Sequence, residues 1–333
     1  MKRILAKSFY LALATLFLLY SWLLFSYDFS SGKEIKWGVT FSAKYAEELG
    51  LDWQEVYLRM LDDLGVKYLR IPVYWSEIEK KPGQFDFRDI DWQLAEANKR
   101  GVQVILAVGY RVPRWPECHA PSWAKDLPQK VFRQRVENLL KQTILHTRIF
   151  TNIYAWQVNN EPFLESFGDC RGITEEELAQ DIGIVKALDN KQRKIVLTES
   201  GELSTWIKSA GLADVIGTSL YRTVWNRYIG YFRYPLPPAF YRFHADLITK
   251  NFPVEKVIIS ELQAEPWPPG KSILQTSISE QMDSFDLELF KHNIDYAKRT
   301  GIDEIYLWGV EWWYWMKERG KPEFWLQARE LFG

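Results

Sequence analysis

The sequence has few of the residues on which many protein chemistries depend. Its 333 residues include only two cysteines, four histidines and four methionines. Beyond the N-terminus, lysine and arginine form no run, and the net charge is −1. Phosphate binding needs clustered cations, so no nucleic-acid partner is expected. No C-x-x-C, H-E-x-x-H or other dense His/Cys pattern occurs, so neither a metal nor another cofactor is expected.

Several enzyme motifs are also absent. The chain has neither G-x-G-x-x-G nor the lysine motif of a P-loop, which disfavours an open, nucleotide-binding sheet. It has no G-x-S-x-G elbow, which weighs against a serine hydrolase. Aromatic residues, in contrast, make up 16% of the chain, with 16 tryptophans and 17 tyrosines. This excess fits uncharged, hydroxyl-rich ligands.

The N-terminus is expected to be a separate unit. Lys2, Arg3 and Lys7 precede residues 8–27, an uncharged stretch long enough to cross a bilayer as a helix. The positive flank predicts that the remainder is exported. Residues 1–30 are therefore predicted to be a membrane-spanning signal anchor that holds an extracytoplasmic domain. The alternatives are a cleaved signal peptide, which would give a secreted protein, and a buried core helix.

No linker divides the rest of the chain, so residues 33–333 are predicted to form one domain. Four segments, "DDLGVKYLRI", "NKRGVQVILA", "KSAGLADVIG" and "AKRTGIDEIY", each join the end of a helix through glycine to a β-rich run. Helix starts are indicated by Asp52 with Glu55 and by Thr174 with Glu177. Eight strands are predicted, at 36–40, 68–73, 102–108, 153–158, 194–198, 215–219, 256–260 and 304–308. Strands that alternate with helices in this number predict a (β/α)8 barrel, with a doubly wound open sheet as the alternative.

In such a barrel, the residues at the C-terminal ends of the strands face a common cavity. The polar and aromatic residues found there are Arg70, Tyr74, Trp75, Glu77, Asn160, Glu161, Tyr221, Glu261, Trp308 and Glu311. Glu161 and Glu261 follow strands on roughly opposite sides of the mouth. Glycoside hydrolysis typically uses two facing carboxyl groups. Their separation decides whether the configuration at the anomeric carbon is retained or inverted.

The chain resembles the clan A retaining glycoside hydrolases, the superfamily that contains the cellulase-like and mannanase-like barrels of family 5. The resemblance rests on Asn160-Glu161-Pro162 after the fourth strand, on Glu261 in "VIISELQAEPW", and on the segment "YLRIPVYWSEIEKKPGQFDFRDID". It covers essentially the whole chain after the N-terminal segment.

The resemblance implies a role for each matching residue. It makes Glu161 the acid/base and Glu261 the nucleophile. It makes Asn160 the partner of the sugar's 2-hydroxyl group and Tyr221 the hydroxyl donor beside the nucleophile. Trp308 would be the platform at the cleavage site, Arg70 the cation that keeps the nucleophile ionised, and Trp75 a further substrate-binding residue of the second-strand segment.

Other residues have plainer interpretations. Glu199, Glu202 and Glu311 are expected to be solvated surface groups, and Glu265 is the rival nucleophile. About half of the remaining loop tryptophans are expected in the cleft, and the aromatic segment after the sixth strand is expected to form its wall, with a membrane-facing patch as the alternative.

The two cysteines fall in neighbouring loops at the same end of the predicted barrel. Cys118 follows the third strand and Cys170 the fourth. Outside the cytoplasm, such a pair is predicted to form a disulfide; inside it, two free thiols would be expected.

The expected function is a membrane-anchored, retaining β-glycosidase that acts on an oligo- or polysaccharide by double displacement. A transglycosylase of the same mechanism, a non-catalytic carbohydrate-binding barrel and a membrane-bound scaffold for a protein partner are the alternatives.

Overall fold

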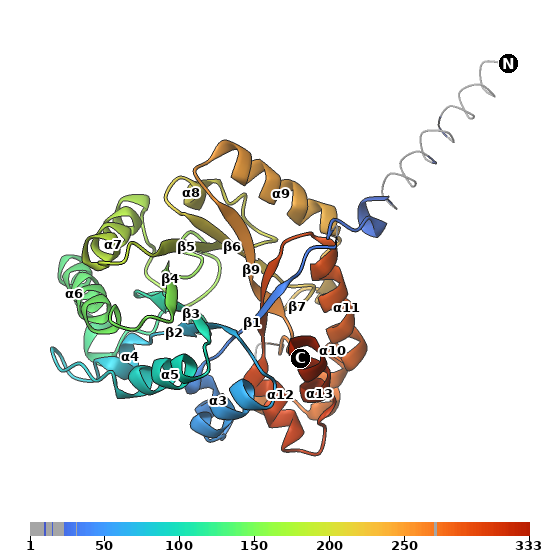
Figure 1. The fold of residues 1–333 in the computed structure, drawn as a ribbon, viewed down its shortest axis with the longest axis horizontal. Helices are drawn as coiled ribbons and strands as arrows, with labels where there is room; N and C mark the ends of the chain where they lie inside the picture. Colours follow the sequence, from blue (N-terminus) through green and yellow to red (C-terminus); the bar gives the residue numbers. More distant parts are fainter. Residues whose placement is uncertain (1–9, 11–14, 16–22, 31, 270–271) are drawn as a thin grey trace.

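The computed structural model describes residues 10, 15, 23–30, 32–269 and 272–333 (Figure 1). In these ranges, no helix has both the length and the apolar character needed to cross a membrane. The predicted spanning stretch, residues 8–27, lies mostly outside the described residues.

Eight parallel strands form the centre of the domain and close into a barrel, as the sequence predicts. The strands are β1 (Lys36–Thr40), β2 (Tyr68–Pro72), β3 (Gln103–Val108), β4 (Ile153–Val158), β5 (Lys194–Glu199), β6 (Val215–Leu220), β9 (Lys256–Gln263) and β10 (Glu304–Trp308). They pair in the order β1-β10-β9-β6-β5-β4-β3-β2, and β2 pairs with β1 to complete the circle. The (β/α)8 architecture is confirmed, and the open sheet is excluded.

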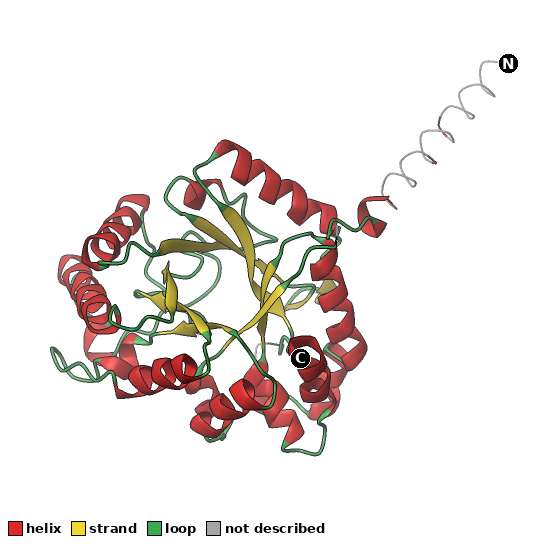
Figure 2. Ribbon diagram, in the orientation of Figure 1, coloured by secondary structure: helices red, strands yellow, loops and turns green. Residues whose placement is uncertain are grey.

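Helices surround the strands (Figure 2). They are α2 (Ala43–Glu48), α3 (Trp53–Asp62), α4 (Trp75–Ile78), α5 (Arg88–Lys99), α6 (Gln129–Thr147), α7 (Glu175–Leu188), α8 (Ile207–Ala210), α9 (Pro238–Asn251), α10 (Ile278–Ser284), α11 (Leu287–Arg299), α12 (Val310–Lys317) and α13 (Glu323–Phe332). The capping box predicted at Thr174 is present, because Thr174 and Glu177 each accept a hydrogen bond from the other's backbone N–H. Asp52 also caps its helix, by accepting from the backbone N–H of Gln54 and Glu55.

The barrel interior changes character along its axis. Near the N-terminal ends of the strands, Ile105, Val196 and Ile258 pack with Tyr306 in a small apolar cluster. Toward the C-terminal ends, the interior holds Arg70, which is completely buried. The larger apolar core lies between the strands and the surrounding helices. The polar end of the barrel is therefore the end where a (β/α)8 fold places its site.

Strand β9 is longer than the sequence predicts, and it is irregular. It continues three residues past the predicted end at 260, and its register shifts against β6 so that Ser219 pairs with Glu261 while Thr218 pairs with Ile259. Its register against β10 also shifts, between Ile305 and Leu307. Such a bulge changes the direction in which the following side chains point, compared with a regular strand.

A small antiparallel hairpin follows β6. Strands β7 (Thr223–Asn226) and β8 (Gly230–Arg233) pair with each other, separately from the barrel. The hairpin comes from the aromatic segment that was expected to form a wall of the cleft.

Candidate active site

Glu161 and Glu261 reach one cavity from different strands. The cavity has a volume of about 850 Å³, and both side chains line it. Glu161 follows β4, and Glu261 lies within the irregular part of β9. Both side chains are largely buried, with 7% and 5% exposure. The structure therefore brings together the two carboxylates that the sequence singled out.

Arg70 hydrogen-bonds to several side chains of this site. From β2, its guanidinium donates to Glu261 Oε1 at 2.9 Å, to Asn160 Oδ1 at 2.6 Å and to Gln157 Oε1 at 2.6 Å. One cation thus fixes side chains from β4 and β9. Because its hydrogen bonds are charge-assisted and shielded from water, Arg70 holds Glu261 and Asn160 in defined positions.

The turn after β4 sets the direction of Glu161. Asn159 and Glu161 both have positive φ angles, of 58° and 40°, which residues other than glycine seldom adopt. The Asn159 side chain secures this turn, because its Oδ1 accepts from the backbone N–H of Tyr110 and Arg111, each at 3.1 Å. Gly109 makes room for that contact, since a Cβ there would lie 2.6 Å from Asn159 Oδ1. The two asparagines therefore have different tasks: Asn159 holds the turn, and Asn160 hydrogen-bonds to Arg70 and Glu117.

The two carboxylates have different electrostatic surroundings. Glu261 is paired with Arg70 and accepts a hydrogen bond from Tyr221 Oη at 3.2 Å. The Glu161 carboxylate accepts no hydrogen bond and forms no ion pair with any residue in the described ranges. Burial, followed by the charges of Glu261 and Glu117, raises the pKa of Glu161 well above its usual range. Glu161 is therefore a carboxyl group with a raised pKa, in the same cavity as a carboxyl group that is paired with a cation.

Aromatic side chains from several loops surround the opening. Trp115, Phe167, Trp267 and Tyr221 form a chain of ring contacts with centroid separations of 5.6, 5.8 and 5.3 Å. Trp225 of the hairpin also lines the cavity, which confirms that the segment after β6 forms part of the wall. The cavity lining therefore combines apolar ring faces with carboxyl groups.

Trp308 lines the cavity, but one face of its ring is covered. The Arg114 guanidinium lies 4.3 Å from the Trp308 centroid and 3.9 Å from that of Tyr45. Arg114 also forms ion pairs with Glu265 and with Glu311. Glu265, the rival nucleophile, is thus engaged with a cation from the loop after β3.

Trp75 does not occupy the place that the sequence suggested. It is 1% exposed, its Nε1 donates to Glu79 Oε2 at 2.6 Å, and its ring packs against Trp123 and Phe132. Helix α4 begins at Trp75, directly after β2, and turns this side chain into the core. The interpretation of Trp75 as a substrate-binding residue is therefore wrong.

Three glutamates expected at the surface are also placed differently. Glu199 is buried and accepts from Ser204 Oγ at 2.6 Å, while Glu311 is completely buried beside Arg114. Glu202 lines the cavity and accepts from Tyr241 Oη and from the backbone N–H of Tyr221, each at 2.7 Å. Burial raises the pKa of Glu202 to about 7.

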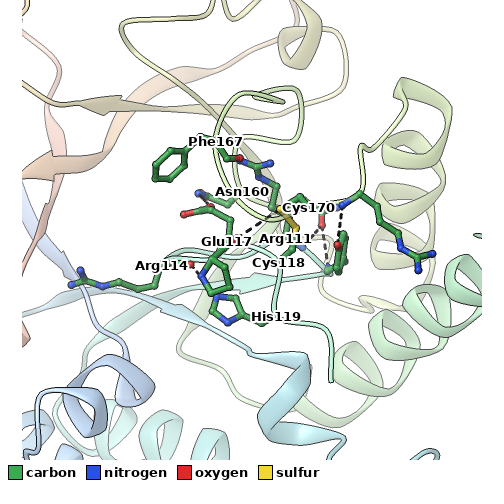
Figure 3. Close-up of a disulfide and its surroundings, with 12 residues drawn as sticks. Arg111, Arg114, Glu117, Cys118, His119, Asn160, Phe167 and Cys170 are labelled. Atoms are coloured by element: carbon green, nitrogen blue, oxygen red, sulfur yellow. Dashed lines mark hydrogen bonds between the residues drawn. A yellow bond between two sulfur atoms is a disulfide. The ribbon is translucent and has the colours of Figure 1, made fainter. Parts of the chain in front are cut away.

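A third carboxyl group lies beside the candidate pair. Glu117, in the loop after β3, lines the cavity and accepts from Asn160 Nδ2 at 2.8 Å (Figure 3). Burial and the charge of Glu261 raise the pKa of Glu117 to about 8. Sequence reasoning missed this residue, because it lies nine positions beyond the end of β3.

The disulfide could have pointed to Glu117. Cys118 and Cys170 are bonded with an S–S distance of 2.07 Å, as predicted, and tie the loop after β3 to the loop after β4 (Figure 3). A residue adjacent to Cys118 is thereby brought toward the loop that carries Glu161. In the described ranges, no cluster of three His, Cys, Asp or Glu side chains is arranged to hold a metal ion.

Comparison with known proteins finds similarity only among solved structures. No protein-family model and no curated protein sequence matches the chain. A family 5 glycoside hydrolase (GH5_18) from Bifidobacterium longum subsp. longum superposes with a TM-score of 0.58 at 12% identity, over 83% of this chain and 70% of that one. Xylanase 10B from Thermotoga maritima gives 0.55 at 13% identity, over 83% of both chains.

Larger enzymes share the same barrel. An exo-β-1,4-mannosidase from Opitutaceae bacterium strain TAV5 gives a TM-score of 0.55 at 15% identity, over 85% of this chain and 53% of that one. The matched region likewise spans about half of the β-galactosidase from Marinomonas ef1. These likenesses show the fold alone, a (β/α)8 barrel.

Proposed function

We propose that this chain is a retaining β-glycosidase that hydrolyses an oligo- or polysaccharide by double displacement. The observation that carries the proposal is the pairing of Glu161 with Glu261 in one cavity, in opposite environments. One carboxyl is unpaired with a raised pKa, and the other is paired with Arg70. Retaining glycoside hydrolysis needs two carboxyl groups of this kind, one that donates a proton and one that attacks the sugar.

Each carboxyl takes one role in the first step. Glu261 attacks the anomeric carbon as the bond from that carbon to the leaving oxygen breaks, and Glu161 gives its proton to that oxygen. In the second step, Glu161 removes a proton from water, which displaces Glu261 from the sugar. Tyr221 donates to the oxygen of Glu261 that Arg70 leaves free, and so orients the nucleophile.

The surroundings of the pair suit a sugar. The aromatic chain from Trp115 to Tyr221 offers apolar faces to the C–H surfaces of pyranose rings. Asn160 lies beside the pair, where the resemblance places the sugar's 2-hydroxyl group. The proteins of similar fold are named as xylanases, a mannosidase and β-galactosidases, all of which act on glycosidic bonds.

Covalent labelling of Glu261 tests the proposal most directly. An activated 2-fluoro-β-glycoside should form a stable ester with the Glu261 side chain, visible by mass spectrometry of the peptide that contains it. Glu261→Gln should not be labelled and should lose roughly a thousandfold in the hydrolysis of an aryl β-glycoside.

A matched control removes the same charge elsewhere on the mouth. Glu165 is exposed in the loop after β4, so Glu165→Gln should keep wild-type labelling and hydrolysis. Absence of labelling and hydrolysis in the folded wild-type protein, with sugar binding intact, would favour the non-catalytic barrel. Proton NMR of the first product would distinguish retention from inversion, and added alcohol acceptors would reveal transglycosylation.

We also propose that the barrel works outside the cytoplasm. Two observations support this location: the bonded pair of Cys118 and Cys170, and the lysine and arginine residues that precede the apolar stretch at 8–27. The test is protease digestion of intact cells that express the full chain. Digestion of the barrel without lysis supports export, and protection until lysis contradicts it.

A further inference from the structure

The cavity has more carboxyl groups than cations that pair with them. Six glutamates line it, namely Glu48, Glu117, Glu161, Glu202, Glu261 and Glu265. Arg70 pairs with Glu261, Arg114 with Glu265 and Lys44 with Glu48. Among the described residues, no lysine, arginine or histidine forms an ion pair with Glu117, Glu161 or Glu202. Only one of these three, Glu161, is needed as the proton donor of the proposed reaction.

Glu117 is held against the position where a sugar would bind. It is 4% exposed, and its Oε2 accepts from Asn160 Nδ2, the amide that would otherwise meet the 2-substituent of the sugar. Its backbone has a φ of 68°, and the disulfide begins at the next residue. The hydrogen bond from Asn160 and the adjacent disulfide restrain Glu117. Such a residue is suited to recognition, because it loses little conformational entropy when a ligand binds.

Two cations act on Glu117 without forming an ion pair with it. Arg111 lowers the pKa of Glu117 by its charge, but its Nη2 donates to the backbone oxygen of Phe167 at 2.8 Å (Figure 3). Arg70, the other nearby cation, is already shared between Glu261 and Asn160. Glu117 is thus a buried carboxyl group whose charge has no direct partner.

A second carboxyl group that lines the cavity also lacks donors. The Glu161 carboxyl group accepts no hydrogen bond in the described part of the chain. A ligand with a positive charge and several N–H donors would supply what these groups lack, and a primary ammonium group has three such donors.

We propose that the sugar bound beside Glu117 carries a free amine at C2, so that the substrate is a β-linked oligomer of a 2-amino-2-deoxy sugar. The inference rests on the proposed function, because the position of C2 is taken from the role of Asn160. The ammonium group pairs with Glu117 and adds positive charge to a cavity that has too little of it. A 2-hydroxyl group brings no charge, and a 2-acetamido group brings bulk without charge.

The protonation of the empty cavity agrees with this assignment. The pKa of Glu117 is raised to about 8 by burial and by Glu261, and that of Glu202 to about 7 by burial. Without a cation, burial favours the protonated forms of these carboxyl groups. An ammonium group beside Glu117 favours its ionised form, so the charge pair forms in a site that water scarcely reaches.

The experiment compares substrates that differ only at C2. Aryl β-glycosides of the gluco, galacto and manno series, each with a 2-amino, 2-acetamido or 2-hydroxyl group, are hydrolysed by the full chain. In the series that is cleaved fastest, kcat/KM for the amine should exceed that for the hydroxyl compound by at least about tenfold. Hydrolysis of the hydroxyl compound equally well or better would overturn the inference and leave the proposed function intact.

Variants assign the preference to Glu117. Glu117→Gln should lower the amine-to-hydroxyl ratio by about tenfold, Glu117→Asp should restore part of it, and Glu165→Gln should keep the wild-type ratio. If Glu117→Gln does not fold, as judged by circular dichroism, the Asp variant and the wild-type ratio still decide. An equal fall of kcat/KM on both substrates would make Glu117 a structural residue and contradict the proposal.

Binding separates this inference from the proposed chemistry. Calorimetry with methyl 2-amino and 2-hydroxy β-glycosides needs no turnover, and the amine should bind about tenfold more tightly, with the advantage shrinking as salt is raised. Tighter amine binding without hydrolysis would refute the glycosidase and sustain the amine site. Equal affinities would refute the amine site, whatever the hydrolysis assays give.

Discussion

Two buried glutamates at opposite ends of the barrel have opposite surroundings. Glu304 begins β10 at the N-terminal end and is 2% exposed. It accepts from Tyr154 Oη at 2.5 Å and from Tyr306 Oη at 2.9 Å, and it pairs with Lys256. Although burial opposes this effect, the hydrogen bonds from Lys256 and Tyr154 lower the pKa of Glu304. Glu161, at the other end, has no such partner and a raised pKa.

The difference separates a carboxylate that supports the fold from one that is available for chemistry. A buried charge costs free energy unless partners compensate it, and at Glu304 three side chains do so. At Glu161 no partner compensates this cost, and burial raises the pKa of the group instead. Burial alone therefore does not identify a functional carboxylate, whereas burial without partners, inside a cavity, does.

The comparison predicts the largest effect at Glu161. Glu161→Gln should reduce the hydrolysis of an aryl β-glycoside with a poor leaving group by roughly a thousandfold, since no proton donor remains. Its melting temperature should equal or exceed that of the wild type, because a neutral amide replaces a carboxyl that has no partners. Azide should restore turnover of an activated substrate by Glu161→Ala, as it attacks the glycosyl-enzyme without a general base.

If Glu161→Gln loses stability but keeps full hydrolysis, Glu161 supports the fold, as proposed for Glu304, and is not the proton donor. Calorimetric melting and initial rates on the same preparation decide this. Glu165→Gln is the matched control, because its exposed carboxylate lies in the same loop.

The opposite pattern, lower stability with nearly unchanged hydrolysis, is expected for a substitution of Glu304 at the other end of the barrel. Glu304→Gln leaves Lys256 without its carboxylate and weakens the hydrogen bonds from Tyr154 and Tyr306. Because Lys256 is partly exposed, the loss should be moderate, about 2 kcal/mol in the free energy of unfolding. Urea titration measures this loss, and kcat at a temperature where the variant is folded should stay within about twofold of the wild type. A thousandfold loss of kcat in folded protein would show that the two ends are coupled.

The sequence predicted the barrel because its regular features are local. Strands β1, β4 and β10 have the predicted limits, since apolar runs and flanking turns mark them plainly. The sequence pattern ends strand β9 at 260 because Glu261 and Gln263 are polar, and polar residues usually mark the end of a buried strand. The bulge that admits these residues depends on pairing with both neighbours, which no local pattern reveals.

The candidate site was predictable only where chemistry coincided with a strand end. Glu161 and Glu261 were found because each follows an apolar run in an unexpected way. Glu117 was missed because the path of a long loop depends on contacts distant in sequence, here the bond from Cys118 to Cys170. The prediction for Trp75 was wrong because a position directly after a strand does not determine whether the side chain points into the cavity or into the core.

The smallest expected effect refines the comparison through pH. Glu161 must be protonated to act as an acid, and the charge of Glu117 is one of the causes that raise its pKa, after burial and Glu261. Glu117→Gln removes that charge, so the pKa of Glu161 should fall. The alkaline limb of kcat/KM should then move to lower pH, by about half a pH unit, because Glu117 itself titrates in the same range.

Rate profiles from pH 5 to 9 on a 2-hydroxy glycoside measure this shift without an ionisable substrate. Glu304→Gln should leave the limb in place, because Glu304 is not among the groups that shift the pKa of Glu161. A limb that moves to higher pH in Glu117→Gln would mean that Glu117 acts as a proton donor to the site rather than as a negative charge beside it. The raised pKa of Glu161 would then rest on burial, Glu261 and Glu202, without a contribution from Glu117.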